Sequence, residues 1–195
     1  MERAKAIHTI MVEMTTGMLV LTTLATIILT WIAFFGGERH RRLGDAADSV
    51  ALFGSAIGTP MILLAILSGF LQWPLEAFLH GAIVQNKLFT ALISLCFWGG
   101  FLFLRLAAGK QLWERRGPAL CALILGLGGF AFLVFTASIG GALARKPSGF
   151  EEMARAFVET RRTFYLPVAA NVLLIALGVA LPLVAFFWPK KKSVH

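Results

Sequence analysis

The sequence predicts an all-α integral membrane protein, a single domain over residues 1–195 that crosses the bilayer five times. Hydrophobic residues make up 58% of the chain and charged residues only 14%, against roughly 25% charged residues in soluble domains. A soluble fold of this composition would expose large apolar patches and aggregate. The hydrophobic residues also form long runs without the alternation of barrel strands, and in lipid helices satisfy the backbone hydrogen bonds of such runs.

Five apolar stretches define the predicted spans, which cover about residues 9–35, 49–72, 83–107, 118–143 and 164–188. At about 1.5 Å rise per residue, each is longer than the roughly 30 Å hydrocarbon core, so the helices are expected to tilt. Glycine pairs and a Trp-Pro step punctuate the connections: Gly36-Gly37, Trp73-Pro74 and Gly140-Gly141. Small residues predict close helix packing at Gly54 and Gly58 of span two, and at Gly126, Gly128 and Gly129 of span four.

The segment before span five predicts a short amphipathic helix over about residues 149–162. Ser148 and Glu151 match a capping box, and the apolar side chains that follow share one helical face. The helix is expected to lie at the membrane interface, or to be a solvated helical linker.

Basic residues predict the orientation, because cytoplasmic loops carry an excess of Lys and Arg. One side carries ten: Arg39, Arg41, Arg42, Arg105, Lys110, Arg115, Arg116, Lys190, Lys191 and Lys192. The other carries eight: Arg3, Lys5, Lys87, Arg145, Lys146, Arg155, Arg161 and Arg162. The tight clusters on the first side favour a cell-membrane protein with its N-terminus outside and its C-terminus in the cytoplasm.

Ionisable residues in or beside a span are the candidates for function, since lipid makes them costly. His8 opens span one, and His80 precedes span three on the same predicted face. Two such imidazoles could be the axial ligands of one b-type haem, with a Met of span one as an alternative ligand. The propionates would then meet basic residues of the same side: Lys87, Arg161 and Arg162.

Competing interpretations remain open for each of these residues. Interfacial histidines commonly hydrogen-bond to headgroups or water. If the chain binds no haem, we expect no other cofactor. Glu13 is a candidate proton carrier or an ion-pair partner for Lys87. A glycine-rich phosphate loop, a zinc-ligand spacing and a nucleophile–base pair are all missing from the sequence.

Several short motifs resemble the DUF2231 family of predicted membrane proteins. The segment from Ile7 to Met14 is similar to that family's opening His-Pro-x-x-Val-His-Phe-Pro, and residues 54–69 resemble its glycine-rich second helix. The resemblance covers roughly residues 7–145, and its other matching residues are His80, Asn86, Gly140 and Gly141. Departures are Thr9 in place of proline, Glu13 in place of a second histidine, and the fifth span.

The resemblance implies a membrane domain that accompanies redox modules. With the histidines, it predicts a membrane subunit of a redox or respiratory complex that is not catalytic alone and passes electrons through a b-haem near the outer face. Its partners would be lipids and other subunits, not nucleic acid. The alternatives are a structural subunit that anchors a larger complex and a small transporter.

Overall fold

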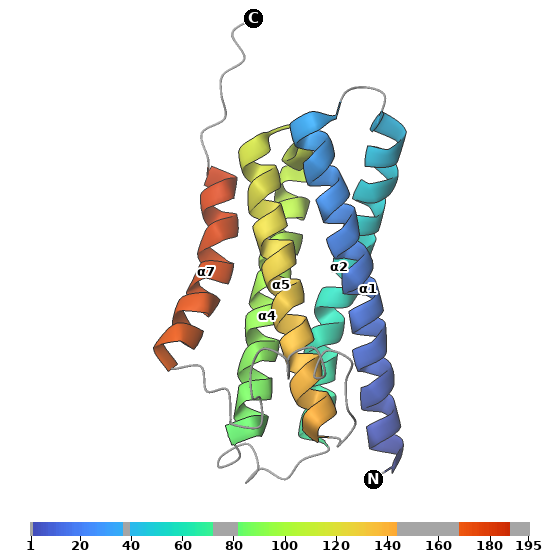
Figure 1. Ribbon diagram of the computed structural model, residues 1–195, viewed down its shortest axis with the longest axis vertical. Helices are drawn as coiled ribbons and strands as arrows, with labels where there is room; N and C mark the ends of the chain where they lie inside the picture. Colours follow the sequence, from blue (N-terminus) through green and yellow to red (C-terminus); the bar gives the residue numbers. More distant parts are fainter. Residues whose placement is uncertain (1, 37–39, 72–81, 144–167, 188–195) are drawn as a thin grey trace, which may run out of the picture.

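The computed structural model describes residues 2–36, 40–71, 82–143 and 168–187, which form helices that lie side by side and alternate in direction (Figure 1). This confirms the predicted all-α class. In chain order the elements are α1 (Glu2–Phe35), α2 (Arg41–Phe70), α4 (Ala82–Ala108), the 3₁₀ helix η2 (Gly109–Trp113), α5 (Arg116–Leu143) and α7 (Val168–Phe187).

Four of these segments are long and apolar enough to cross a membrane, so the chain is a multi-pass membrane protein. They are Ala6–Phe35, Arg41–Phe70, Ile83–Trp113 and Arg116–Gly141. The predicted fifth span corresponds to α7, in which a shorter apolar segment, Val172–Leu181, is found. The predicted interfacial helix over 149–162, with its capping residues, lies outside the described residues.

Helix α2 begins at Arg41, well before the predicted start of span two at residue 49. The prediction was wrong here because it followed apolar runs, and the first turns of α2 are polar. These turns contain Ala47 and Asp48, which are both buried. Tertiary contacts therefore hold in a helix a segment that composition alone assigned to a loop.

Helices α1 and α2 approach each other closely over two glycines of α2. A Cβ atom at Gly54 would collide with Thr22 Oγ1 of α1 and lie 3.0 Å from the carbonyl oxygen of Met18. At Gly58 it would lie 2.6 Å from Cδ2 of Leu19. The prediction of close packing at this glycine pair is confirmed.

Helix α4 carries the largest buried side chains and packs against α5, α7 and α2. The rings of Trp98 and Phe101 meet edge to face with centroids 5.6 Å apart. On α5, a Cβ at Gly129 would lie 2.8 Å from Trp98 Nε1, and one at Gly128 would collide with the ring of Phe97. The α5 glycines thus give space to the aromatic side chains of α4.

Helix α7 lies at the edge of the bundle, against α4 and α5 (Figure 1). Its buried Gly178 packs on Phe97, whose Cδ2 would be 3.1 Å from an added Cβ, and on Cys96. The Sγ of Cys121 on α5 is 3.5 Å from the carbonyl oxygen of Leu181. Both cysteines are free thiols that contribute to packing, as the sequence predicted.

In the described spans, the buried hydroxyl groups other than that of Thr59 find acceptors on the backbone. In α1, the hydroxyls of Thr15, Thr23 and Thr26 each donate to the carbonyl oxygen four residues earlier, at 2.7 Å. Ser94 of α4 donates instead to the carbonyl of Gly129 in α5, at 2.8 Å. These bonds let polar residues lie in the apolar interior without an unsatisfied donor.

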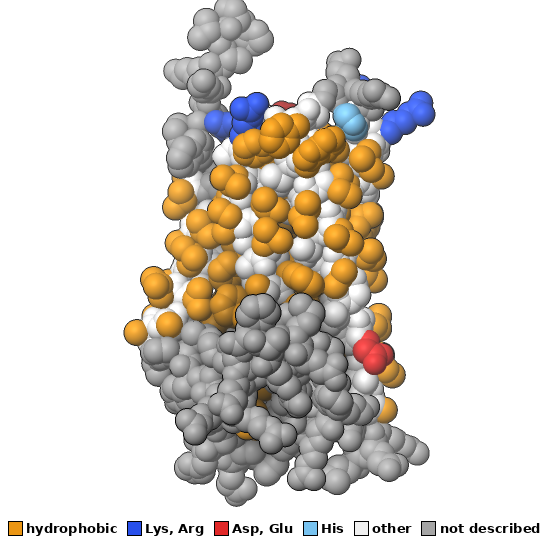
Figure 2. All heavy atoms as spheres, in the orientation of Figure 1, with side chains coloured by type: hydrophobic (Ala, Val, Ile, Leu, Met, Phe, Trp, Pro, Cys, Tyr) orange, Lys and Arg blue, Asp and Glu red, His pale blue; other side chains and the backbone are white. Residues whose placement is uncertain are grey.

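The surface divides as a membrane protein requires (Figure 2). Hydrophobic side chains cover the flank, whereas Lys and Arg gather at the end where α1 leads to α2. Large apolar side chains such as Leu21, Phe53 and Leu106 are more than half exposed on the flank, where lipid is the solvent.

A substitution at Gly54 tests the α1–α2 packing. Gly54→Ala places a methyl group against Thr22 and the Met18 backbone, and overpacking of this kind costs about 1–3 kcal/mol. We expect a lower midpoint of thermal unfolding in detergent, followed by circular dichroism. Gly99→Ala is the matched control, because no atom lies within 4 Å of its Cβ position. Equal effects of the two substitutions would contradict the packing.

Candidate functional site

His8 lies near the start of α1 and is held against α2. Its ring is half-buried, and Nδ1 is 2.8 Å from the hydroxyl oxygen of Ser68. Ser68 is itself buried, and its hydroxyl is 3.0 Å from the carbonyl oxygen of Ala65. The ring also lies on Gly69, with His8 Cε1 3.6 Å from the position of a Cβ there. The imidazole is therefore fixed by a polar contact and an apolar one.

The contact between His8 and Ser68 fits two arrangements of protons. A serine hydroxyl has one hydrogen, and the Ser68 oxygen lies within hydrogen-bond distance of both the Ala65 carbonyl and His8 Nδ1. With the hydroxyl turned to Ala65, Ser68 accepts a hydrogen bond from Nδ1–H of His8. The neutral imidazole then has a lone pair on Nε2, which a metal or a proton can take.

Lys87 of α4 lies at the same end of the bundle as His8. Its Nζ is 3.2 Å from the position of a Cβ on Gly140 of α5. Beside it, the hydroxyl of Thr136 donates to that of Thr90, at 2.9 Å, and Thr90 bonds back to the first turns of α4. This network fixes the α4–α5 contact from which the ammonium group extends.

The structure brings only part of the predicted haem site together. His8 and Lys87 share one end of the bundle, whereas His80, Arg161 and Arg162 lie outside the described residues. Among the residues that are described, no three His, Cys, Asp or Glu side chains gather as metal ligands.

Glu13 is not part of this group. Its side chain is exposed, and within the described ranges the ion pairs are Asp48–Arg105 and Asp45–Lys110. An ion pair of Glu13 with Lys87, one of the two interpretations of Glu13, is not among them. Since α1 turns by about 100° per residue, Glu13 and His8 point in different directions from the helix.

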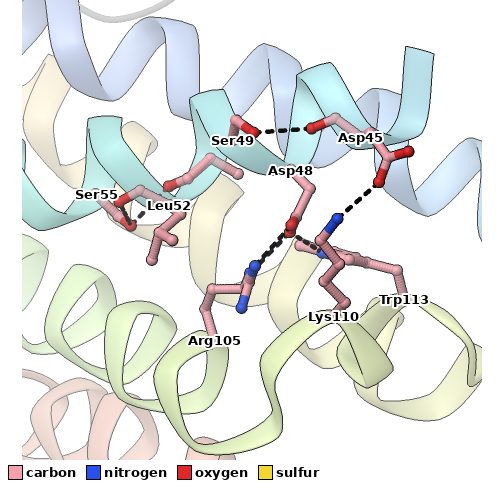
Figure 3. Close-up of polar contacts among 9 residues, drawn as sticks. Asp45, Asp48, Ser49, Leu52, Ser55, Arg105, Lys110 and Trp113 are labelled. Carbon is pink, nitrogen blue, oxygen red and sulfur yellow. Dashed lines mark hydrogen bonds and ion pairs between the residues drawn. The ribbon is translucent and has the colours of Figure 1, made fainter. Parts of the chain in front are cut away.

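A buried ion pair joins α2 to α4 at the opposite end of the bundle (Figure 3). Arg105 donates from Nε to Oδ1 of Asp48 at 2.7 Å and from an Nη to Oδ2 at 2.6 Å. The indole N–H of Trp113 donates to Oδ1 at 2.7 Å. Only 7% of the Arg105 side chain and 6% of the Asp48 side chain are exposed. The carboxylate is thus fully engaged by three hydrogen bonds.

A second ion pair, Lys110 with Asp45 at 2.8 Å, lies on the exposed side of the first (Figure 3). Nearby, the Arg116 guanidinium stands 5.5 Å from the centre of the Phe34 ring. These contacts link the ends of α1, α2 and α4 to the start of α5. This end of the bundle is held by charge, whereas the middle is held by apolar packing.

Sequence reasoning missed the Asp48–Arg105 pair. From the sequence, Arg105 serves only to predict the orientation, and Asp48 lies just before the predicted start of span two. The available signal was that Arg105 falls inside an apolar stretch, where an arginine needs a partner. Which acidic residue Arg105 contacts depends on how α2 and α4 pack. The sequence of neither segment predicts this packing.

No protein-family model, curated protein or solved structure matches this chain.

The buried pair predicts a large difference between two neighbouring aspartates. Asp48→Asn leaves the Arg105 charge buried without its counterion, which costs about 3–5 kcal/mol. We expect a clear loss of thermal stability in detergent. Asp45→Asn, the matched control, removes only an exposed contact and should change little.

A double substitution separates the charge effect from general damage. Asp48→Leu together with Arg105→Met should recover most of the stability lost in Asp48→Asn, because it leaves no unpaired charge. A double variant as unstable as the single one would contradict this account.

Proposed function

We propose that the chain is an integral membrane subunit of a redox or respiratory complex, which holds one b-type haem near the face where α1 begins. His8 is one axial ligand and His80 the other. The observation that carries the proposal is the bond between His8 Nδ1 and Ser68. Histidines that bind metals generally donate their second ring N–H to a fixed acceptor, which sets the tautomer and makes the ligand more basic.

The residues of this chain would act on the haem by position and charge. His8 presents the Nε2 lone pair, and Ser68 holds the proton at Nδ1. Lys87 compensates the negative charge of a propionate, with Arg161 and Arg162 as further partners. When bound, the haem iron takes up and releases single electrons.

We also propose that the chain crosses the membrane five times and has a fixed orientation. Helix α7 has 20 residues, which at about 1.5 Å each match the roughly 30 Å hydrocarbon core. Its sequence contains no charged residue, and it packs along α4. An odd number of spans places the two ends of the chain on opposite sides. The basic clusters favour the C-terminus in the cytoplasm of a cell.

The resemblance to the DUF2231 family supports a site at the end of the bundle that holds His8. The quoted motifs include His8, residues before α4 and the glycines that close α5. In this fold the described ones, among them His8, Asn86 and Gly140, belong to helix ends that lie together. These three residues, far apart in the chain, thus share one end of the bundle.

Haem binding is tested on protein expressed with a supply of haem. We expect a Soret band and a pyridine-haemochrome spectrum of the b type. His8→Ala and His80→Ala should each abolish the low-spin form or convert it to high spin. His40→Ala is the matched control, since His40 lies at the opposite end and packs on Trp31.

Ser68→Ala gives a finer test of the same site. It keeps the ligand but removes the acceptor for Nδ1–H, so haem affinity should fall by about tenfold or more and the reduction potential should rise. A wild-type protein without haem would contradict the proposal and leave a structural membrane subunit.

Orientation is tested with tags at the two ends of the chain. A tag after the Lys190–Lys192 cluster should be protected from an impermeant reagent in intact cells, whereas a tag at Met1 should react. Both ends on one side would contradict five spans, and the reverse pattern would invert the orientation.

A further inference from the structure

The end of α1 that leads to α2 carries an aromatic surface in contact with basic residues of two other segments. Trp31 and Phe35 are 48% and 76% exposed, and the rings of Phe34 and Phe35 have centroids 6.1 Å apart. The Arg116 guanidinium of α5 stands 5.5 Å from the centre of the Phe34 ring. His40, which precedes α2, meets Trp31 edge to face, with ring centroids 5.3 Å apart. These five residues form the α1 end surface.

The α1 end surface lies where the apolar flank of the bundle ends. The candidate span of α1 ends at Phe35, and that of α2 begins at Arg41, so the two helix ends stand at one membrane boundary. Lys and Arg side chains gather at this end of the bundle, just beyond the apolar flank (Figure 2). Tryptophan and arginine side chains at such a boundary meet lipid headgroups. Lipid is therefore the neighbour of this surface, and the charge of the surface selects among lipids.

Positive charge at this end exceeds the negative charge of the described residues there. The two ion pairs neutralise Arg105 and Lys110. The charged residues that remain in the described helix ends are four arginines and one glutamate: Arg41, Arg42, Arg115, Arg116 and Glu114. Three of these arginines are exposed, so their charge faces the surroundings.

The rest of the chain does not supply the missing negative charge. Residues 37–39, which connect α1 to α2, contain one glutamate and one arginine. Residues 188–195, which follow α7, contain three lysines and no acidic side chain. Residues 72–81 and 144–167 join helices at the opposite end of the bundle. The surplus is thus left to an anion of the surroundings, and at a membrane boundary phospholipid headgroups supply that anion.

We propose that the α1 end surface binds an anionic phospholipid, whose headgroup is held by Arg116 and by Arg41 and Arg42 of α2. Among its described contacts, Arg116 uses one N–H, which is 3.4 Å from the carbonyl oxygen of Phe34. A guanidinium has five N–H donors, and the others can bind phosphate oxygens. The first turn of α2 has no acidic residue, and a helix N-terminus favours a negative group.

The aromatic rings favour a lipid over an acidic protein as the occupant of this surface. Trp31 and Phe35 are exposed beside the cations, and the acyl chains below a headgroup cover such rings, whereas an acidic protein surface does not. The inference goes beyond the proposed redox role and does not depend on the haem.

The test uses the full chain in phosphatidylcholine vesicles, with Trp31 as the reporter. Phosphatidylglycerol or phosphatidylcholine with brominated acyl chains is added, because bromine quenches the fluorescence of a tryptophan that it contacts. The contribution of Trp31 is the quenching that Trp31→Phe removes, and it is determined in the same way for each variant. We expect brominated phosphatidylglycerol to bind at Trp31 at least about fivefold more tightly than brominated phosphatidylcholine, since each arginine near an anionic surface contributes about fivefold.

Substitutions assign the preference to this surface. Arg116→Gln should lower the preference about fivefold, and the double substitution Arg41→Gln/Arg42→Gln should lower it at least as much. Lys110→Gln is the matched control, because it removes the same charge at the same end of the bundle. Since Lys110 is paired with Asp45, this control should leave the preference within about twofold of the wild type.

Equal binding of the two lipids at Trp31 of the wild type would overturn the proposal and favour an acidic protein as the occupant. A preference that survives Arg116→Gln, or that Lys110→Gln lowers equally, would also overturn it, since the attraction would then come from the overall charge. Inorganic phosphate should displace the brominated phosphatidylglycerol no better than chloride at the same ionic strength. Selective displacement by phosphate would assign the site to the free anion instead of the lipid.

Discussion

Within a bilayer, a polar group must find its hydrogen-bond partner in the protein, because the hydrocarbon offers none. The helices meet this constraint for the backbone, and the threonine hydroxyls of α1 meet it by donating to the preceding turn. The same constraint explains the bond from His8 to Ser68 and the triple engagement of Asp48. Among the described core residues, Thr59 Oγ1 and Trp98 Nε1 are buried without a partner. The structure gives no physical account of these two.

The polar contacts divide the bundle into three levels. At one end, charged and indole groups tie α2 to α4 through Asp48, Arg105 and Trp113. The middle consists of glycines opposite large side chains, as where Gly129 faces Trp98. At the other end lie His8, which contacts Ser68, and Lys87 of α4.

Glu13 and His8 show why neighbours on one helix can serve different purposes. His8 faces α2 inside the bundle, whereas Glu13 is exposed on the outside of α1. The same helix thus presents one polar side chain to the interior of the bundle and another to its surroundings.

The sequence by itself determined the membrane class, the approximate spans and the glycines at helix contacts, because hydropathy and residue size act locally along a helix. It identified His8 as a polar residue at a helix start, but not its partner. Tertiary structure decided that Ser68, sixty residues away, contacts Nδ1 of His8, and that Asp48 belongs to a helix and neutralises Arg105. It also decided that Glu13 points outward. Each of these outcomes depends on how one helix is rotated against another, and this rotation is set by packing across the whole bundle.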